Sequence, residues 1–309
     1  MTNNTMVKEF FLLGFNGHRN LKIALFLLFY FLYLSTVSGN AVIIMLVCLY
    51  RNLQSPMYVF MSNLALSDII LTTNVVPNML AIIAHGKQVI SLNACIAQFY
   101  FYGALASMEC FLLMVMSYDR YLAVCKPLHY SQIMDIKLQK CLITTSWLTS
   151  LSVPVLPAVL MHQLNFCGPN TIDHFFCDLA PILQLSCSDT SILQTESLIA
   201  SLHVVLLPFL FIISSYIHIF ITILQISSAQ GRQKTFSTCS AHLLVVCTYF
   251  LTIITVYSDP SQTYSSNVNK ARSVLYIVLT PLLNPMIYAL RNKEIKDTFQ
   301  KMLFNVLHK

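Results

Sequence analysis

Two carboxylic acids, Asp68 and Glu109, lie inside long apolar stretches of the sequence, and so do the amides Asn40 and Asn284. An unpaired charge in an apolar environment is costly, so these polar groups are expected to meet one another. Two carboxylates that share a site either bind a cation or hold a proton, because like charges at close range cannot both stay ionised. The four residues predict either a site for a cation or a proton, or a hydrogen-bonded cluster that only packs helices.

A second acid and a base follow on the same segment as Glu109. Arg120 lies eleven residues after Glu109, about three helical turns, so both should face the same side of one helix. In the sequence Asp119-Arg120-Tyr121, the arginine can pair with Asp119 at rest and become an exposed contact when neighbouring helices separate. A solvated ion pair at a helix end is the alternative, and these residues alone favour it.

The elements that position these residues are predicted to be membrane-spanning helices. Of the 309 residues, 56% are hydrophobic and 10% charged, with a mean hydropathy of +0.68, whereas a soluble chain carries about 25% charged residues. Charge-poor stretches of roughly 20 residues are long enough to cross a bilayer. They predict seven spans, at residues 22–48, 56–84, 92–125, 138–161, 192–226, 234–258 and 269–291. Pro208 predicts a kink in the fifth span, and Pro281 and Pro285 predict kinks in the seventh.

The fold class is therefore all-α, a seven-helix membrane bundle in one domain, residues 1–309. We expect an outer N-terminus over 1–21, the bundle over 22–291, and a tail over 292–309 with an amphipathic eighth helix from residue 293 to about 306. With the C-terminus inside, twelve Lys and Arg lie on the inner side and six on the outer side. This distribution, and a glycosylation sequence at Asn3, predict a plasma-membrane protein with its N-terminus outside.

Four cysteines are expected on the oxidising outer side. Cys95 begins the third span, and Cys167, Cys177 and Cys187 lie between the fourth and fifth. Disulfides are expected there, but four cysteines allow three pairings, and spacing does not choose between them. His174, Cys177 and Asp178 also resemble a metal-binding set, which is disfavoured because a disulfide would consume the thiolate.

Other classes of function fit the sequence poorly. The net charge of +6 comes from scattered Lys and Arg without a basic run, so nucleic acid is not an expected partner. The chain lacks HExxH, GxSxG and glycine-rich phosphate-loop patterns, so we expect no enzyme and no cofactor beyond a bound cation. A transporter or channel would need more than two acids at mid-membrane depth to line a polar path.

Five stretches, each on an expected helix, carry a resemblance that covers nearly the whole chain. They are Leu53-Gln-Ser-Pro-Met-Tyr58, Met116-Ser-Tyr-Asp-Arg-Tyr-Leu-Ala-Val-Cys125 with Lys126-Pro-Leu-His-Tyr130, Ser215-Tyr216, Lys234-Thr-Phe-Ser-Thr-Cys-Ser-Ala-His-Leu243, and Pro281-Leu-Leu-Asn-Pro-Met-Ile-Tyr-Ala-Leu-Arg-Asn292. The sequence resembles the odorant receptors, a family of rhodopsin-like G-protein-coupled receptors. It departs from them at Tyr249-Phe250-Leu251, where the family commonly has Phe-Tyr-Gly, so the family's tyrosine is missing at position 250.

The resemblance implies disulfides Cys95–Cys177 and Cys167–Cys187, and a sodium ion near Asp68. It implies a ligand site on inward-facing positions of the outer half: Phe99, Tyr102, Gly103, Ala106, Ser107, His203, Leu207, Phe250, Ile253, Ile254, Tyr257, Val274 and Ile277. None of these is charged, so the ligand should be small, neutral and mostly apolar.

The resemblance also implies that the protein signals through a stimulatory heterotrimeric G protein and cyclic AMP. The implied contacts are Asp119, Arg120, Tyr121, Tyr216, Arg232 and Lys234. A chemosensory role outside olfaction is the alternative, because the amino-acid sequence does not indicate the tissue of expression.

Overall fold

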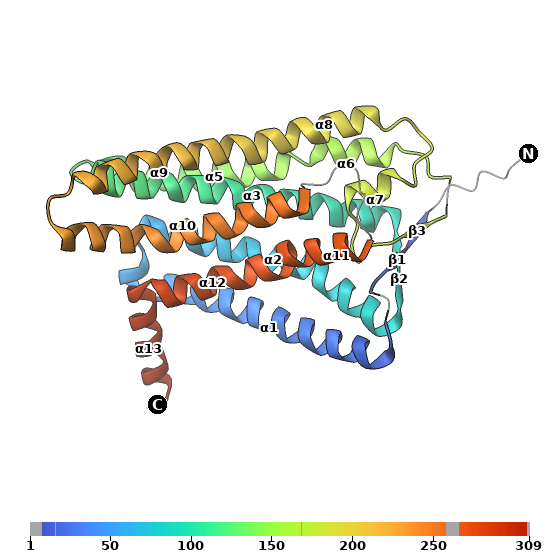
Figure 1. Ribbon diagram of the computed structural model, residues 1–309, viewed down its shortest axis with the longest axis horizontal. Helices are drawn as coiled ribbons and strands as arrows, with labels where there is room; N and C mark the ends of the chain where they lie inside the picture. The colour runs from blue at the N-terminus through green and yellow to red at the C-terminus, as the bar shows by residue number, and fades with distance from the viewer. Residues whose placement is uncertain (1–7, 16, 168, 258–265, 308–309) are drawn as a thin grey trace, which may run out of the picture.

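The computed structural model describes residues 8–15, 17–167, 169–257 and 266–307, and it shows a bundle of long helices that run along one axis (Figure 1). The first three spans are α1 (Arg19–Leu49), α2 (Pro56–His85) and α3 (Leu92–Cys125). The fourth consists of α5 (Ile136–Ser152) and α6 (Val155–His162), and the fifth of α8 (Ser191–Ser201) and α9 (Leu207–Gln225). The last two are α10 (Ala229–Tyr257) and α11 (Ser266–Val274) followed by α12 (Thr280–Arg291).

The span count agrees with the seven expected segments. Among the described residues, six helices are long and apolar enough to cross a membrane, and a seventh follows when the two parts of α10, which meet at 45°, are counted as one span. One expectation needs correction, because the fourth span is not a continuous helix over 138–161. It breaks between Ser152 and Val155, since Pro154 has no backbone N–H to continue the ladder.

The expected proline distortions take the form of π-helical turns. One turn, Leu202–Leu206, directly precedes α9 and Pro208, and the other, Leu275–Leu279, directly precedes α12 and Pro281. A π turn accommodates one extra residue and locally loosens the hydrogen-bond ladder. Residues after such a turn therefore lie on a different side of the helix from the one that uniform α-helical spacing predicts.

A small sheet, which hydropathy did not reveal, covers one end of the bundle. Strand β1 (Glu9–Leu13) pairs antiparallel with β2 (Lys87–Ser91) and parallel with β3 (Thr171–Ile172). Alternate residues Phe10 and Leu12 are fully buried beneath it. Figure 1 shows this sheet at the end of the bundle where the described chain begins, opposite the last helix, α13 (Lys293–Leu307).

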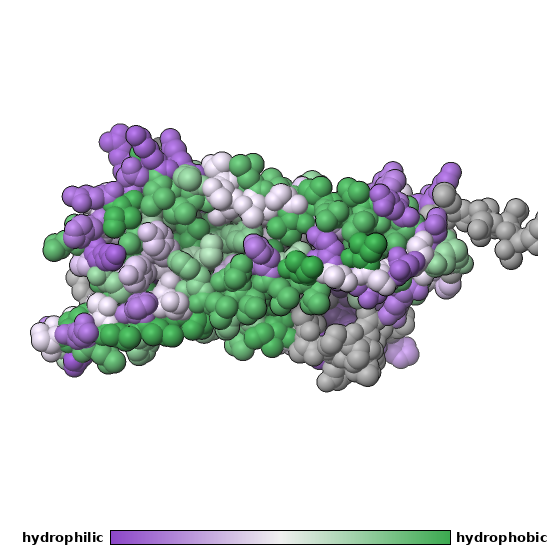
Figure 2. All heavy atoms as spheres, turned by 90° about the horizontal axis from the view of Figure 1, so that it is seen from above, coloured by the Kyte–Doolittle hydropathy of each residue, from purple (hydrophilic) through white to green (hydrophobic). Residues whose placement is uncertain are grey.

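The outer surface of the bundle suits a lipid environment. Hydrophobic side chains cover its middle, and hydrophilic side chains gather toward its two ends (Figure 2). Within the bundle α3 is the central helix, because 67% of the residues in its most apolar stretch are buried. Two short helices, α4 (Tyr130–Ile133) toward the end that carries α13 and α7 (Leu179–Leu183) toward the end that carries the sheet, complete the connections that bear on function.

Candidate functional site

The mid-membrane polar residues do come together. Asn284 on α12 donates a hydrogen bond of 2.9 Å to Asp68 on α2, and the Asp68 carboxyl lies within hydrogen-bonding reach of Glu109 on α3. Tyr276, in the π turn before α12, donates its hydroxyl to the other side of Glu109 at 3.1 Å. The expected cluster is therefore a junction of three helices, with Tyr276 as a member that the sequence did not single out.

Asn40 completes this junction from α1. Its amide nitrogen donates to the backbone carbonyl of Pro281 at 3.0 Å, and its side chain lines a narrow void together with Asp68 and Asn284. Several buried oxygens around the junction have no hydrogen-bond partner among the described residues: Asn40 Oδ1, Asp68 Oδ1, Glu109 Oε1 and Asn284 Oδ1. Buried oxygens of this kind are suited to a small hard cation or to a shared proton.

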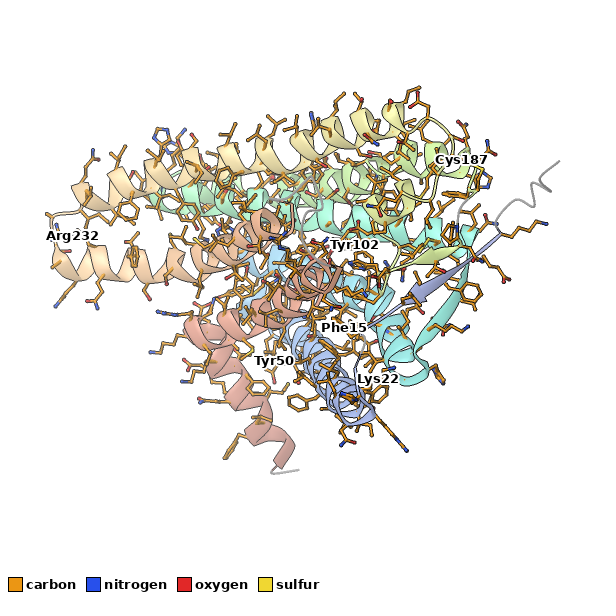
Figure 3. All side chains as sticks on the ribbon, turned by 45° about the vertical axis from the view of Figure 1, so that its right-hand side comes forward. Phe15, Lys22, Tyr50, Tyr102, Cys187 and Arg232 are labelled. Carbon is orange, nitrogen blue, oxygen red and sulfur yellow. A yellow bond between two sulfur atoms is a disulfide. The ribbon has the colours of Figure 1, made fainter. Side chains whose placement is uncertain are left out.

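Above the junction lies a group of six aromatic side chains, which we call the aromatic cluster: Tyr102, Phe176, Phe209, Tyr249, Phe250 and Tyr276. Tyr102 contacts Phe176 and Tyr276, with ring centroids 5.1 and 6.0 Å apart. Tyr249 contacts Phe250 and Tyr276, and Phe250 contacts Phe209 at 4.9 Å. Figure 3 shows Tyr102 well inside the bundle, between Cys187 near one end and Arg232 at the other.

The hydroxyl of Tyr249 crosses from α10 to α3. It donates to the backbone carbonyl of Ala106 at 3.0 Å and lies 2.9 Å from the sulfur of Cys110. The neighbouring Phe250 has no hydroxyl and packs on Phe209 of α9. The exchanged order of Tyr and Phe therefore gives this chain a polar link between α10 and α3, which the sequence did not predict.

The expected ligand positions divide into four groups: buried, half-buried, exposed, and outside the described part of the structure. Six of them are buried: Phe99, Tyr102, Ser107, Phe250, Ile253 and Ile277. Ala106 and Val274 are half-buried, and so is Gly103, which however faces the fourth span, since an added Cβ would lie 3.3 Å from Pro154. Tyr257 is the last residue of α10, and its side chain lies outside the described part of the structure.

For three positions the expectation that they face inward is wrong. Leu207 is 51% exposed, Ile254 is 58% exposed, and His203 is also exposed. His203 lies within the π turn before α9 and Leu207 directly after it, so uniform helical spacing assigned them to the wrong face. On α10 the buried face includes Tyr249, which turns Ile254 outward.

The loop between α6 and α8 lies over the aromatic cluster. Both disulfides implied by the resemblance are confirmed, Cys95–Cys177 and Cys167–Cys187, so Cys177 has no free thiolate for a metal. The adjacent Phe176 packs on Tyr102. His174 lies 3.3 Å from Ser273 on α11, and burial, reinforced by Lys270, lowers its pKa to about 3, so that the ring is neutral.

Lys270 joins three parts of the end of the bundle that carries the sheet. Its side chain is 1% exposed, and its ammonium group, carried by α11, lies 2.9 Å from the carbonyl of Gly14 and 2.5 Å from the Asp173 carboxylate. This contact was not predictable from the sequence, because an isolated lysine beside a predicted span indicates only the orientation of that span. Lys270 thus fastens the segment after β1 and the α6–α8 loop to the seventh span.

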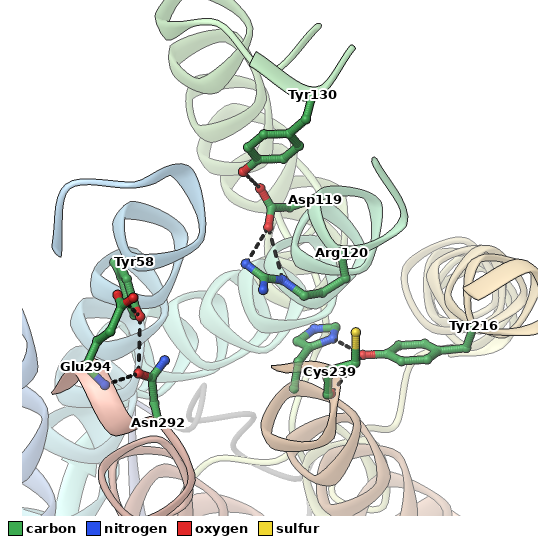
Figure 4. A network of polar contacts seen from close by, with 9 residues as sticks. Tyr58, Asp119, Arg120, Tyr130, Tyr216, Cys239, Asn292 and Glu294 are labelled. Atoms are coloured by element: carbon green, nitrogen blue, oxygen red, sulfur yellow. Dashed lines mark hydrogen bonds and ion pairs between the residues drawn. The ribbon is translucent and has the colours of Figure 1, made fainter. Parts of the chain in front are cut away.

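At the opposite end Arg120 is closed in by its neighbours (Figure 4). Its guanidinium donates to Asp119 at 2.7 and 3.1 Å, and only 13% of its side chain is exposed. Tyr130, on α4, donates to the same carboxylate at 2.7 Å. Burial and the neighbouring Asp119 raise the pKa of Tyr130, so its hydroxyl remains a donor.

Tyr216 of α9 is bound to α10 rather than to Arg120. Its hydroxyl lies 2.7 Å from Nδ1 of His242, a residue within one of the quoted sequence stretches that we had not assigned a role. Tyr121 packs on the His218 ring, with centroids 6.0 Å apart. Arg232 is exposed and donates to a nearby backbone carbonyl. The side chain of Lys234 lies outside the described part of the structure, and so does all of Asn3.

Comparisons with known proteins agree with this geometry. A family model described as "Olfactory receptor" matches residues 29–306. Olfactory receptor 6N1 of Homo sapiens is 43% identical over 301 residues, covering 97% of this chain and 96% of that protein. Olfactory receptor 1f45 of Rattus norvegicus is 43% identical over 302 residues, covering 98% and 96%. The crystal structure of squid rhodopsin has the same fold, with a TM-score of 0.75, 18% identity and coverage of 95% of this chain and 84% of that one.

Proposed function

The chain belongs to the olfactory receptor family of G-protein-coupled receptors, which are multi-pass membrane proteins and not enzymes, and on that basis we propose that it binds a small neutral odorant at the aromatic cluster. The position of the cluster supports this, because it lies between α3 and α10 beneath the α6–α8 loop. Its rings offer apolar faces and a few hydroxyls, and the described residues that form it include no Lys or Arg to balance an acidic ligand.

The second part of the proposal is that α10 carries the signal to the inner end. The same helix bears Tyr249 in the aromatic cluster and His242 against Tyr216. Arg120 is closed in by Asp119, so a G protein of the stimulatory olfactory type needs α10 and α9 to move before it reaches Arg120 and Tyr216. A ligand drives this change only by binding the open arrangement more tightly than the closed one.

The orientation that fits this proposal places the sheet and the disulfides outside the cell. Both disulfides lie at the end of the bundle where β1, β2 and β3 cover the helices, and disulfides persist in the oxidising exterior. Arg120 and α13 then face the cytoplasm, as the distribution of Lys and Arg predicts. The protein would reside in the plasma membrane, with Asn3 on the glycosylated side.

A cyclic AMP assay in cells that express the full chain tests the ligand class. Among 1-octanol, octanal, octanoic acid and octylamine, and homologues of other lengths, only neutral members should activate, at concentrations about tenfold or more below any charged homologue. Phe250→Ala should weaken the response, whereas Leu251→Ala, at a neighbouring position that is 64% exposed, should not. Equal potency of charged and neutral homologues would overturn the proposed site.

We propose that the Asp68–Glu109 pair holds one positive charge, a sodium ion or a proton, that favours the closed arrangement. The unpartnered oxygens of both acids support this assignment. Replacing external sodium with N-methylglucamine should raise basal cyclic AMP if sodium is the occupant, and the Asp68→Asn variant should lose that sensitivity. If basal cyclic AMP does not depend on sodium but changes with pH, the occupant is a proton. If basal cyclic AMP depends on neither, the assignment is refuted.

Removal of the Tyr249 hydroxyl should raise basal signalling. Tyr249→Phe deletes the polar link from α10 to α3 while keeping the ring, and a loss of about 1 kcal/mol from the closed arrangement increases the open population about fivefold. Thr248→Val is the matched control, because that hydroxyl bonds only to a carbonyl of its own helix. Unchanged basal cyclic AMP at equal surface expression would show that the link does not hold α10 closed.

A further inference from the structure

A hollow at the outer end of the bundle lies apart from the aromatic cluster. It lies between α2 and α3 under β2, has a volume of about 310 Å³, and none of the ligand positions expected from the sequence lines it. Such a volume is at the lower end of the range for small-molecule sites. From its lining and its position we propose that this hollow, the α2–α3 site, binds a neutral amphiphile, an aliphatic alcohol or a similar molecule, that enters from the outer leaflet of the membrane.

The site faces outward from the bundle. Its wall on α3 consists of Ala94, Ala97 and Phe101, which are spaced by one helical turn each and are exposed, Phe101 by 46%. Of the buried residues of α3, Gln98 forms the inner wall of the hollow, whereas Tyr102 does not line it. A ligand therefore reaches this site laterally, from the lipid side, without passing the sheet that covers the bundle.

The opposite wall provides hydrogen-bonding groups without charge. Asn74 and Asn78 lie about one helical turn apart on α2, and Gln88 lies on β2. Within the described part of the chain, the side chains of Asn78 and Gln88 form no hydrogen bond, and the amide oxygen of Asn74 accepts none. Amides that lie level with the outer end of a membrane bundle can satisfy a hydroxyl or a carbonyl, whereas an ionised group would find no counter-charge in the lining.

The backbone of α2 is interrupted beside the site. Pro77 lies between the two asparagines and has no N–H, so the helix loses one backbone hydrogen bond to the carbonyl of Thr73. Small side chains on the facing helix, Ala94 and Ala97, leave the room that the hollow occupies. Amides on one side and alanines with a phenylalanine on the other match a molecule with one polar end and a hydrocarbon body.

Side-chain amides hold α2 and α3 together behind the site, in a contact that we call the joint. Gln98 of α3 donates to the carbonyl of Asn74 at 2.9 Å, and Asn74 donates back to the carbonyl of Gln98 at 3.0 Å. The oxygen of the same Gln98 side chain accepts from the backbone N–H of Cys177 at 2.9 Å. The amides of this joint are thus held by three hydrogen bonds, so the hollow is a preformed feature of the fold.

Photolabelling of the full receptor in cell membranes tests the site. The probe is 1-octanol that carries a diazirine near the end of its chain, and labelled peptides are identified by mass spectrometry. Labelling of the α2 and α3 segments around Asn78 and Ala97 should saturate and be competed by excess 1-octanol. Label spread evenly over the lipid-facing residues of α1, α9 and the other helices would overturn the proposal.

Two variants and two further probes make the test specific. Ala97→Phe fills the hollow from an exposed position and should lower labelling about tenfold, whereas Leu66→Phe, on an exposed part of α2 outside the site, should not. Asn78→Leu should lower labelling by the alcohol about fivefold, the equivalent of one hydrogen bond, and leave labelling by the corresponding alkane unchanged. Undiminished labelling of Ala97→Phe refutes the site, and stronger labelling by the octanoic acid analogue refutes the neutral ligand class.

Discussion

Replacement of Cys177 with Ser should abolish delivery of the folded receptor to the cell surface. The Cys95–Cys177 disulfide joins residues 82 apart in the sequence, and the chain-entropy relation assigns a bond of that span about 4.5 kcal/mol of stabilisation. The loss extends beyond the bond, because the backbone N–H of Cys177 also donates to the side-chain oxygen of Gln98, and Cys177 lies next to Phe176 over the aromatic cluster. A surface-epitope assay by flow cytometry, normalised to total protein, measures the effect.

The second disulfide is the matched control for this prediction. Cys167–Cys187 closes a segment with a sequence separation of only 20, for which the same relation gives about 3.3 kcal/mol. Cys187→Ser should therefore lower surface delivery less than Cys177→Ser. Equal delivery of Cys177→Ser and the unmodified receptor would show that the loop is held by its other contacts, chiefly by Lys270.

Hydropathy and charge predicted the helices because a bilayer imposes one strong rule, a long apolar helix for each crossing. The spans and the eighth helix agree with the structure within a few residues, apart from the break at Pro154. The shared face of Glu109 and Arg120 was also predictable. Because α3 is one continuous α-helix, the number of residues between the two side chains gives their relative direction.

Contacts made by loops and terminal segments could not be predicted in this way. The pairing of β1 with β3 joins residues about 160 positions apart, and no local pattern encodes such a partner. Lys270 is similar, because its two partners, Gly14 and Asp173, are distant in the sequence. The faces of His203 and Leu207 were mispredicted because no sequence signal marks the extra residue of a π turn.

Arg120 is the residue on which the proposed coupling to a G protein depends most. In the structure its charge is satisfied by Asp119 alone among the described acids, and Tyr130 holds the carboxylate from the other side. Opening of the inner end would leave the guanidinium with free donors directed at the incoming protein, and charge-assisted hydrogen bonds of this kind contribute about 1.5–3 kcal/mol each.

Replacement of Arg120 with Ala should therefore reduce the odorant-stimulated cyclic AMP response at least about tenfold, at unchanged odorant binding. The change also leaves the buried Asp119 carboxylate without its cation, which can reduce folding, so the double variant Asp119→Asn with Arg120→Ala removes that charge as well. Both variants should lack the response once signals are normalised to surface expression. Lys126→Ala, an exposed basic residue just after α3, should signal normally. A full response from the double variant would mean that the G protein is engaged through other residues, because no arginine would remain at this position to contact it.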